Sequence, residues 1–331
     1  MKKKVEEVAE SIDRLTTVDI AARGVIYKLY SAVRDLMKEP LTLIAARRSI
    51  EVVKPNDHVF IVTGFRVPPN YIQETDGPIG AAALARALSL GLKAKPFLFI
   101  EEEAKDILIS TVSGMGLKYV SKESKESKEL HELGQVMVVG LPTDKEKAIT
   151  IMDDLLNKYS PSILLFIEKA GRNEKGFCHT MRGFNVTPYH AYAEYMLERV
   201  SKQGSLTIGI GDGGNEVGMG KIKDTVKNFV PYGRECQCPC KGGIAAESST
   251  DILVVATVSN WGGYGIEACL AHLINEPKLM HDPSMEERAI ELAVKAGAID
   301  GVTGLAEPSV DGMFKDIHSS IVRILYEIIK K

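Results

Sequence analysis

The sequence has no apolar run long enough to cross a membrane and no apolar signal segment at its start. A membrane-spanning helix needs roughly 18 or more consecutive apolar residues, and no segment supplies them. Positive charge is not in excess either. The formal net charge of -3 gives no general attraction to nucleic acid or to anionic lipid. We therefore expect a cytoplasmic protein that binds neither nucleic acid nor a membrane.

Cysteine is scarce and unevenly spread, which excludes the disulfide framework of a small secreted domain. Three of the five cysteines fall together, at Cys236, Cys238 and Cys240. Their one-residue spacing differs from the C-x-x-C pair that is usual in zinc sites. A zinc ion would also need a fourth ligand, which would have to be Cys178, His179 or Cys269. We favour a loop of free thiols or a disulfide over structural zinc.

Two signatures of common enzyme classes are missing from the sequence. It contains neither the G-x-S-x-G nucleophile elbow nor the G-x-x-x-x-G-K-S/T phosphate loop. What is present is a globular composition, with 45% hydrophobic and 26% charged residues in a chain of 331. A chain of this length can bury a sizeable core as one large domain or as two packed ones.

Apolar segments of strand length alternate with helical segments along most of the chain. Strands are predicted at residues 59–62, 96–100, 117–120, 135–139, 163–167, 206–210 and 252–258. Helices are predicted at residues 80–92, 104–114, 145–159, 191–203, 264–274, 285–296 and 310–329, with a polar loop at 121–128. This alternation predicts a three-layer α/β fold, in which a mostly parallel sheet is covered by helices on both faces. Residues 1–55 should form a helical segment packed on the core, and residues 56–331 the α/β catalytic domain.

Glycine, amide and acidic residues follow several of the predicted strands. Parallel sheets bind ligands outside the carboxyl ends of their strands, so these residues should converge on one rim. The richest segment, residues 209–220, contains G-x-G-x-x-G between a strand and a helix. A dinucleotide site is disfavoured there, because the Asp212 carboxylate would repel a pyrophosphate.

A metal site uses the same acidic residues without this conflict. The predicted ligands of a hard divalent cation, Mn²⁺ or Mg²⁺, are oxygen donors from two loops: Glu74, Asp76, Asp212, Asn215 and Glu216. An alternative stays open in which Asp76 and Asp212 only cap the helices that follow them. We expect the cation to lie between the two loops, and Glu168 and Arg172 to border the same pocket.

Five segments together resemble the D-glutamate cyclase C-terminal domain family. They are residues 63–65 (TGF), 74–78 (ETDGP), 209–220 (GIGDGGNEVGMG), 259–264 (SNWGGY) and 309–312 (SVDG). The resemblance covers nearly the whole chain and implies the fold and the acidic site. It also implies a reaction, the closure of D-glutamate to 5-oxo-D-proline with loss of water, in a protein whose separate N-terminal domain precedes this one. A local departure is the run Glu101-Glu102-Glu103, where an aspartate-led turn is expected.

Two enzyme mechanisms fit these residues. We favour a metal-dependent phosphatase acting on a small anionic phosphorylated metabolite, because oxygen ligands and glycine-rich loops suit phosphate. Its catalytic residues would be Asp212, Glu168, Lys169, Arg172 and Arg182. Its substrate would lie against Gly64, Gly213, Gly214, Asn260, Gly262 and Gly263. The alternative is a D-glutamate cyclase in which Lys169 accepts the amine proton, and a non-catalytic ligand sensor is a third possibility. A homo-oligomer is compatible with either enzyme.

Overall fold

The computed structural model describes residues 2–121 and 132–330, so most of the predicted polar loop at 121–128 lies outside the described residues. Seven strands form one sheet in the order β5-β6-β4-β1-β7-β8-β9, and all six pairings are parallel. The strands are β1 (His58–Gly64), β4 (Lys95–Glu101), β5 (Lys118–Val120), β6 (Gln135–Leu141), β7 (Ile163–Lys169), β8 (Leu206–Gly211) and β9 (Ile252–Val255). The predicted α/β class is confirmed.

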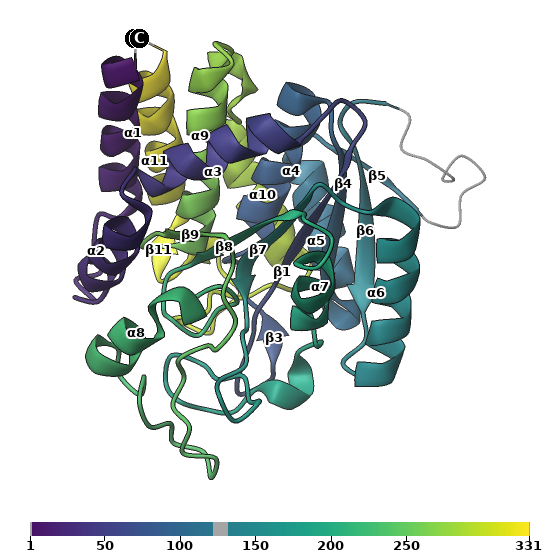
Figure 1. The fold of residues 1–331 in the computed structure, drawn as a ribbon, viewed down its shortest axis with the longest axis vertical. Helices are drawn as coiled ribbons and strands as arrows, with labels where there is room; N and C mark the ends of the chain where they lie inside the picture. Colours follow the sequence, from purple (N-terminus) through teal and green to yellow (C-terminus); the bar gives the residue numbers. More distant parts are fainter. Residues whose placement is uncertain (1, 122–131, 331) are drawn as a thin grey trace.

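Helices cover both faces of the sheet, as predicted (Figure 1). One face packs against α6 (Lys145–Tyr159) and α7 (Glu194–Val200). The opposite face packs against α2 (Ile26–Met37), α3 (Leu41–Val52), α4 (Pro78–Leu92), α5 (Lys105–Gly114) and α9 (Ser259–Leu273). Four further helices pack on this layer: α1 (Lys2–Thr16) and α11 (Lys315–Ile329) on α9, α10 (Pro283–Lys295) on α5, and α8 (Lys223–Phe229) on α2.

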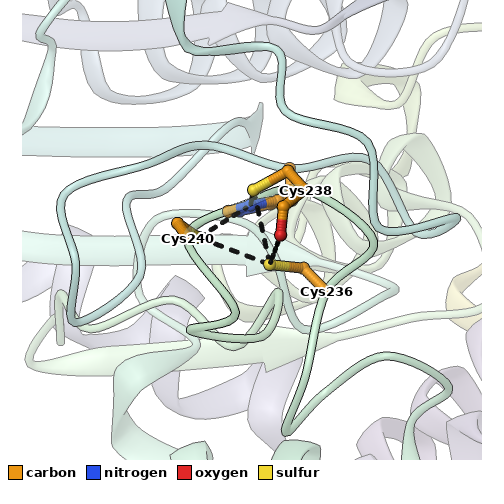
Figure 2. Close-up of side chains that lie close together, drawn as sticks. Cys236, Cys238 and Cys240 are labelled. Atoms are coloured by element: carbon orange, nitrogen blue, oxygen red, sulfur yellow. Dashed lines mark hydrogen bonds between the residues drawn. The ribbon is translucent and has the colours of Figure 1, made fainter.

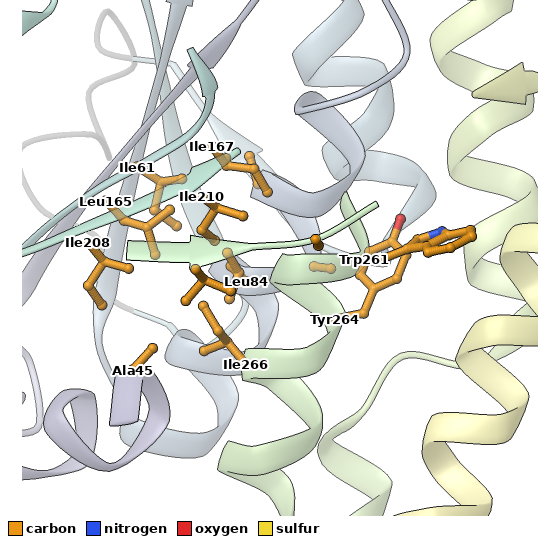
Figure 3. Packing of buried hydrophobic residues seen from close by; sticks show 14 of the residues in the cluster. Ala45, Ile61, Leu84, Leu165, Ile167, Ile208, Ile210, Trp261, Tyr264 and Ile266 are labelled. Carbon is orange, nitrogen blue, oxygen red and sulfur yellow. The ribbon is translucent and has the colours of Figure 1, made fainter. Parts of the chain in front are cut away.

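Side chains alternate between the two faces along each strand, because successive residues of a strand point in opposite directions. On β1, Phe60 belongs to the cluster under α6 and α7, while Ile61 belongs to the larger cluster on the other face. Figure 3 shows Ile61 and Leu165 directed toward the helical layer that carries Leu84 and Ile266. Both faces are apolar, which explains why the strands read as continuous hydrophobic runs.

Helix α9 lies within this larger cluster and is buried almost all round, with thirteen of its fifteen residues inaccessible. Its glycines allow close packing: a Cβ on Gly262 would lie 2.6 Å from the Ile210 side chain, and one on Gly265 would lie 2.6 Å from Thr42. The helix begins at Ser259, so the prediction of a loop up to residue 263 was wrong.

Other element boundaries also differ from the prediction. The C-terminal helix starts at Lys315, because residues 309–314 form a hairpin of β10 (Ser309–Val310) and β11 (Met313–Phe314). Asp311 and Gly312 turn this hairpin with positive φ angles of 52° and 77°. The boundary drawn at residue 55 stays a prediction, since α1, α2 and α3 contribute to the same apolar cluster as the later helices. Among the described residues, no helix is long and apolar enough to cross a lipid bilayer.

A buried histidine links α9 to α10. His281 Nδ1 lies 2.6 Å from a Glu267 carboxylate oxygen, and His281 Nε2 lies 3.3 Å from Glu286, which also accepts a hydrogen bond from Tyr264. Burial opposes protonation, but the charges of Glu267 and Glu286 outweigh it and raise the pKa of His281 to about 10. The protonated ring therefore holds two buried carboxylates together.

We expect the contacts of His281 with Glu267 and Glu286 to stabilise the fold in a pH-dependent way. A histidine whose pKa is raised on folding contributes fully below its unfolded pKa of about 6.5, and the contribution is lost as pH rises through about 10. His281→Gln should lower the free energy of unfolding by about 3–5 kcal/mol at pH 6 and by clearly less at pH 10. Urea titrations at both pH values measure the difference, with His272→Gln, near the C-terminus of α9, as the control. An equal loss at the two pH values would contradict the assignment.

Candidate active site

A cavity of about 230 Å³ lies at the carboxyl ends of the central strands. The helix after β1 packs on one face of the sheet and the helix after β7 on the other, so the topology switches between these two strands. Five carboxylate residues line the cavity: Glu74, Asp76, Glu168, Asp212 and Asp311. Two arginines and several apolar side chains complete it, among them Arg23, Arg182, Phe65 and Phe184.

Asp76 lies where the N-termini of α4 and α9 meet. Its carboxylate accepts hydrogen bonds from the backbone N–H groups of Ser259 (2.9 Å), Asn260 (2.8 Å) and Gly77 (3.0 Å). In return, the Asn260 side-chain oxygen accepts from Gly77 and Gly80 at the start of α4. Asp76, just before α4, thus caps α9, and Asn260 of α9 caps α4, which explains why α9 begins earlier than its local sequence predicts. Asp76 is a helix cap and also a lining residue of the cavity.

A β-bulge directs Glu168 into the cavity. Thr63 pairs with Ile167 and Gly64 with Lys169, so Glu168 is the extra residue, with a φ of 42°. The Glu168 carboxylate accepts a hydrogen bond from the Ser259 hydroxyl at 2.5 Å. Without the bulge, strand alternation would place this side chain on the apolar face under α7. The predicted proximity of Glu168 and Asp212 holds, because both line the cavity.

The glycine-rich loop after β8 is closed by its own glutamate. The Glu216 carboxylate accepts hydrogen bonds from the backbone N–H groups of Asp212 (3.2 Å), Gly213 (2.8 Å) and Gly214 (2.7 Å). Convergent N–H groups of this kind form an anion-binding nest. Here a carboxylate of the chain itself fills the nest, so these amides are not free for a substrate phosphate.

Arg23 and Asp311 are functional candidates that the sequence analysis missed. Arg23 lies in the loop after α1, and its guanidinium is 2.5 Å from Asp212 and 3.9 Å from Asp311. Asp311 lies in the hairpin before α11, and its Oδ2 atom is buried without a hydrogen-bond partner. Position 311 belongs to the 309–312 motif, which could have identified it. Arg23 lies in no such motif, and its partner Asp212 is 189 residues away.

The acidic residues are crowded enough to change their protonation. Burial, and then the neighbouring negative charges, raise the pKa values of Glu74, Glu168 and Asp311 well above their usual range. Burial and Asp212 raise the pKa of Asp76 to about 7 and that of Glu216 to about 8, although backbone N–H groups oppose both shifts. The cluster therefore retains protons near neutral pH or requires a cation to balance its charge.

The geometry provides two overlapping sets of possible metal ligands. One set is Asp76, Asp212 and Asp311, and the other is Glu168, Asp212 and Glu216, with the ligand atoms of each set within 4.8 Å of one another. Asn215 also lines the cavity, and its side-chain oxygen is buried without a hydrogen-bond partner. Oxygen donors of this kind fit a hard divalent cation. Glu74 lines the same cavity but belongs to neither set.

Two basic residues predicted for the site have other partners. Lys169 is fully buried and forms an ion pair with Glu101, which also accepts a hydrogen bond from the Ala191 N–H at 3.0 Å. Arg172 pairs with Glu194 at 2.6 Å and lines a separate surface cleft, so it does not border the acidic cavity with Glu168. Arg182 does line the acidic cavity.

The six residues expected to contact substrate are all described by the structure, and none of them lines the cavity. Gly262 packs on β8, and Gly263 lies against the backbone of Gly80. Asn260 caps α4. The other three glycines lie where a side chain would clash, Gly64 with Glu101, Gly213 with Met181 and Gly214 with Val226. Their glycine identity reflects packing and backbone conformation.

Two comparisons with known proteins agree with each other. The family described as "D-glutamate cyclase-like, C-terminal" matches residues 12–326. A human protein named "D-glutamate cyclase, mitochondrial" is 25% identical over 343 residues, which cover 96% of this chain and 51% of the human protein. The chain thus spans about half the length of this relative.

These comparisons overturn the preference for a metal-dependent phosphatase. Both matches carry the cyclase name, so the expected hydrolase and phosphatase classes are wrong, and the manganese assignment gains no support. The filled nest in the loop after β8 gives a physical reason. The amides that were expected to bind phosphate already bind Glu216.

We expect the nest to depend on the oxygens of Glu216. Glu216→Ala leaves three buried N–H groups without an acceptor and should lower the free energy of unfolding by about 1–3 kcal/mol for each of them. Glu216→Gln removes the same charge but keeps one acceptor oxygen, so its loss should be smaller. Urea unfolding of the two variants separates hydrogen bonding from charge. Equal stability of the two variants would show that the carboxylate does not hold the loop.

Proposed function

We propose, from the premise that this chain belongs to the D-glutamate cyclase-like C-terminal family, that it closes D-glutamate to 5-oxo-D-proline with loss of water. The observation that carries the proposal is the family match over residues 12–326, together with the cyclase relative that aligns with 96% of the chain. The cavity supports it independently. Its volume of about 230 Å³ is below the roughly 300–1,000 Å³ of sites for drug-sized ligands, which suits a small metabolite.

The reaction makes specific demands on the site. The amine nitrogen attacks the γ-carboxyl carbon, a C–N bond forms and a C–O bond breaks. The ammonium group gives up two protons overall, and both leave with the departing oxygen as water. A site for this reaction needs a group that accepts protons from nitrogen, a group that donates them to oxygen, and positive charge near both substrate carboxylates.

The cavity contains groups for each of these tasks. Arg182 and Arg23 supply the positive charge that attracts the substrate carboxylates. The carboxylate wall attracts the substrate ammonium group. Glu168 is suited to carry protons from nitrogen to oxygen, because burial and its acidic neighbours raise its pKa. Its carboxylate accepts a proton from nitrogen, and its protonated form then donates that proton to the leaving oxygen. We assign the proton-transfer role to Glu168 in place of Lys169, whose ammonium group is held by Glu101 outside the cavity.

A hard divalent cation fits the same cavity. We propose that Asp76, Asp212 and Asp311 would hold it, because their oxygens converge within 4.8 Å and Asp311 retains a buried oxygen that accepts no hydrogen bond. When bound, such a cation would polarise the γ-carboxyl group of the substrate. Arg23 already balances part of the negative charge of these carboxylates through its ion pair with Asp212. The cation would balance the rest of that charge.

The activity is tested directly by incubating the purified chain with D-glutamate and measuring 5-oxoproline by chiral chromatography. We expect conversion of the D-enantiomer, and a loss of about 10²–10⁴-fold in Glu168→Gln, because a positioned proton carrier contributes that much. Asp106→Asn, an exposed carboxylate of α5, is the matched control and should retain activity.

A conversion rate that Glu168→Gln leaves unchanged would remove Glu168 from the mechanism. Absence of any 5-oxoproline, with or without added Mg²⁺, would contradict the proposed reaction.

Cation binding has a readout that does not depend on catalysis. Millimolar Mg²⁺ should raise the unfolding temperature of the wild type, because a ligand that binds only the folded state stabilises it. Asp311→Asn should be more stable than the wild type without Mg²⁺, since it relieves the repulsion from Asp76 and Asp212, and should lose the Mg²⁺-dependent shift. If Mg²⁺ raised the unfolding temperature of both proteins equally, Asp311 would be excluded as a ligand. If Mg²⁺ raised neither unfolding temperature, the proposed cation site would be wrong, and Arg23 and bound protons would balance the charge of the cluster.

A further inference from the structure

A second cluster of possible metal ligands lies outside the acidic cavity, in the segment between α8 and β9. Here Cys236, Cys238 and Cys240 gather their sulfur atoms on one side of a tight turn (Figure 2). The Cys236 sulfur lies 3.5 Å from that of Cys238 and 3.3 Å from that of Cys240. The turn closes with a hydrogen bond from the Lys241 N–H to the Cys238 carbonyl. One-residue spacing therefore brings the three thiols together.

His179 completes the cluster from a segment almost sixty residues earlier in the chain. Its Nε2 atom lies 3.2 Å from the Cys238 sulfur and 3.6 Å from the Cys240 sulfur. Its other ring nitrogen, Nδ1, lies 3.1 Å from the Phe177 carbonyl oxygen. A carbonyl at Nδ1 fixes the ring with Nε2 free to coordinate, an arrangement that recurs around metal-bound histidines.

The four ligand atoms have the size and composition of a tetrahedral site. With zinc–sulfur bonds of about 2.3 Å and a zinc–nitrogen bond of about 2.0–2.1 Å, a tetrahedron has edges of about 3.8 Å between sulfurs and about 3.6 Å between sulfur and nitrogen. The distance from the Cys240 sulfur to His179 Nε2, 3.6 Å, equals the ideal edge, and the other three, 3.2–3.5 Å, are a few tenths of an ångström shorter. All four atoms lie within 4.8 Å of one another.

We propose that Cys236, Cys238, Cys240 and His179 form a structural zinc site. Three thiolates and an imidazole select a soft or borderline metal in tetrahedral geometry and leave no position for a substrate. Two N–H groups face the Cys240 sulfur, from Gly242 at 3.4 Å and from the Asn173 side chain at 3.7 Å. Such donors offset the net negative charge of a zinc ion bound by three thiolates.

The remaining cysteines do not compete for this role. Cys178 faces the Ala170 carbonyl at 3.9 Å, and Cys269 lies 3.3 Å from the Thr42 hydroxyl on α3. Of the three residues that the sequence offered as a fourth ligand, His179 is the one at the cluster. A disulfide would need a sulfur–sulfur distance of about 2.05 Å and would leave one thiol and His179 unused.

The zinc site would join two loops, one of which lines the acidic cavity. His179 is followed directly by Thr180, Met181 and Arg182, which are cavity residues, and its carbonyl accepts a hydrogen bond from Asn215 at 2.8 Å. The other loop adds hydrogen bonds from Gln237 to the Gly183 and Arg182 carbonyls. The ion would therefore hold Arg182 in place, and this role does not depend on which reaction the cavity performs.

Metal analysis of protein purified without chelators tests the site. We expect about one zinc ion per wild-type chain, and X-ray absorption at the zinc edge should give three sulfur ligands and one nitrogen ligand. Cys238→Ser and His179→Gln should lose most of the zinc. Cys269→Ser, at the buried cysteine of α9, is the matched control and should retain it.

The wild type provides a second measurement in case the variants fail to fold. A thiol-reactive mercurial should release zinc in step with three thiols, and Co²⁺ added to the metal-free chain should give thiolate charge-transfer bands. The proposal is overturned if wild type grown with added zinc contains almost none, if mass spectrometry finds a disulfide within residues 236–240, or if Cys238→Ser keeps its zinc. Iron or copper in place of zinc would overturn the choice of metal.

Discussion

The concentration of buried negative charge at the carboxyl edge of the sheet is the constraint on which the rest of this site depends. Asp76 is tolerated there because the N-termini of α4 and α9 converge on it and donate three backbone hydrogen bonds. This requirement fixes the start of α9, whose glycines then bring the helix close to the sheet. The fold and the site are therefore stabilised by the same contacts.

Each remaining carboxylate is accommodated in a different way. Glu216 does not line the cavity, and its carboxylate binds the amides of its own loop. Asp212 is paired with Arg23, and Glu168 accepts a hydrogen bond from Ser259. Asp311 retains an oxygen that has no hydrogen-bond partner, although Arg23 lies 3.9 Å from it. Asp311 is thus the carboxylate of the cluster whose charge is balanced least directly, since Arg23 lies closer to Asp212 than to Asp311.

The sequence predicted the sheet, its two apolar faces and the convergence of Asp76, Glu168 and Asp212, because strand periodicity and the carboxyl-edge rule are local or topological signals. It did not predict features that depend on distant partners. The start of α9 depends on Asp76, which is distant in the sequence. The role of Glu216 depends on the backbone conformation of its loop, which no local sequence pattern indicates. Arg23 was not predicted as a site residue because it lies in a loop outside the recognisable motifs. The prediction that glycines contact the substrate was wrong, because the sequence cannot distinguish a glycine required for packing from one required for binding.

The cavity is assembled from residues near both ends of the described chain. Arg23 comes before the first strand and Asp311 after the last strand of the main sheet, yet they lie 3.9 Å apart across Asp212. During synthesis, Glu168 of β7 and Asp212, which follows β8, emerge from the ribosome well before Asp311 does. A nascent chain can bury its strands early, but its cavity stays open on one side until the hairpin before α11 has left the exit tunnel. The cavity therefore gains its full lining only after the hairpin of β10 and β11 has been synthesised.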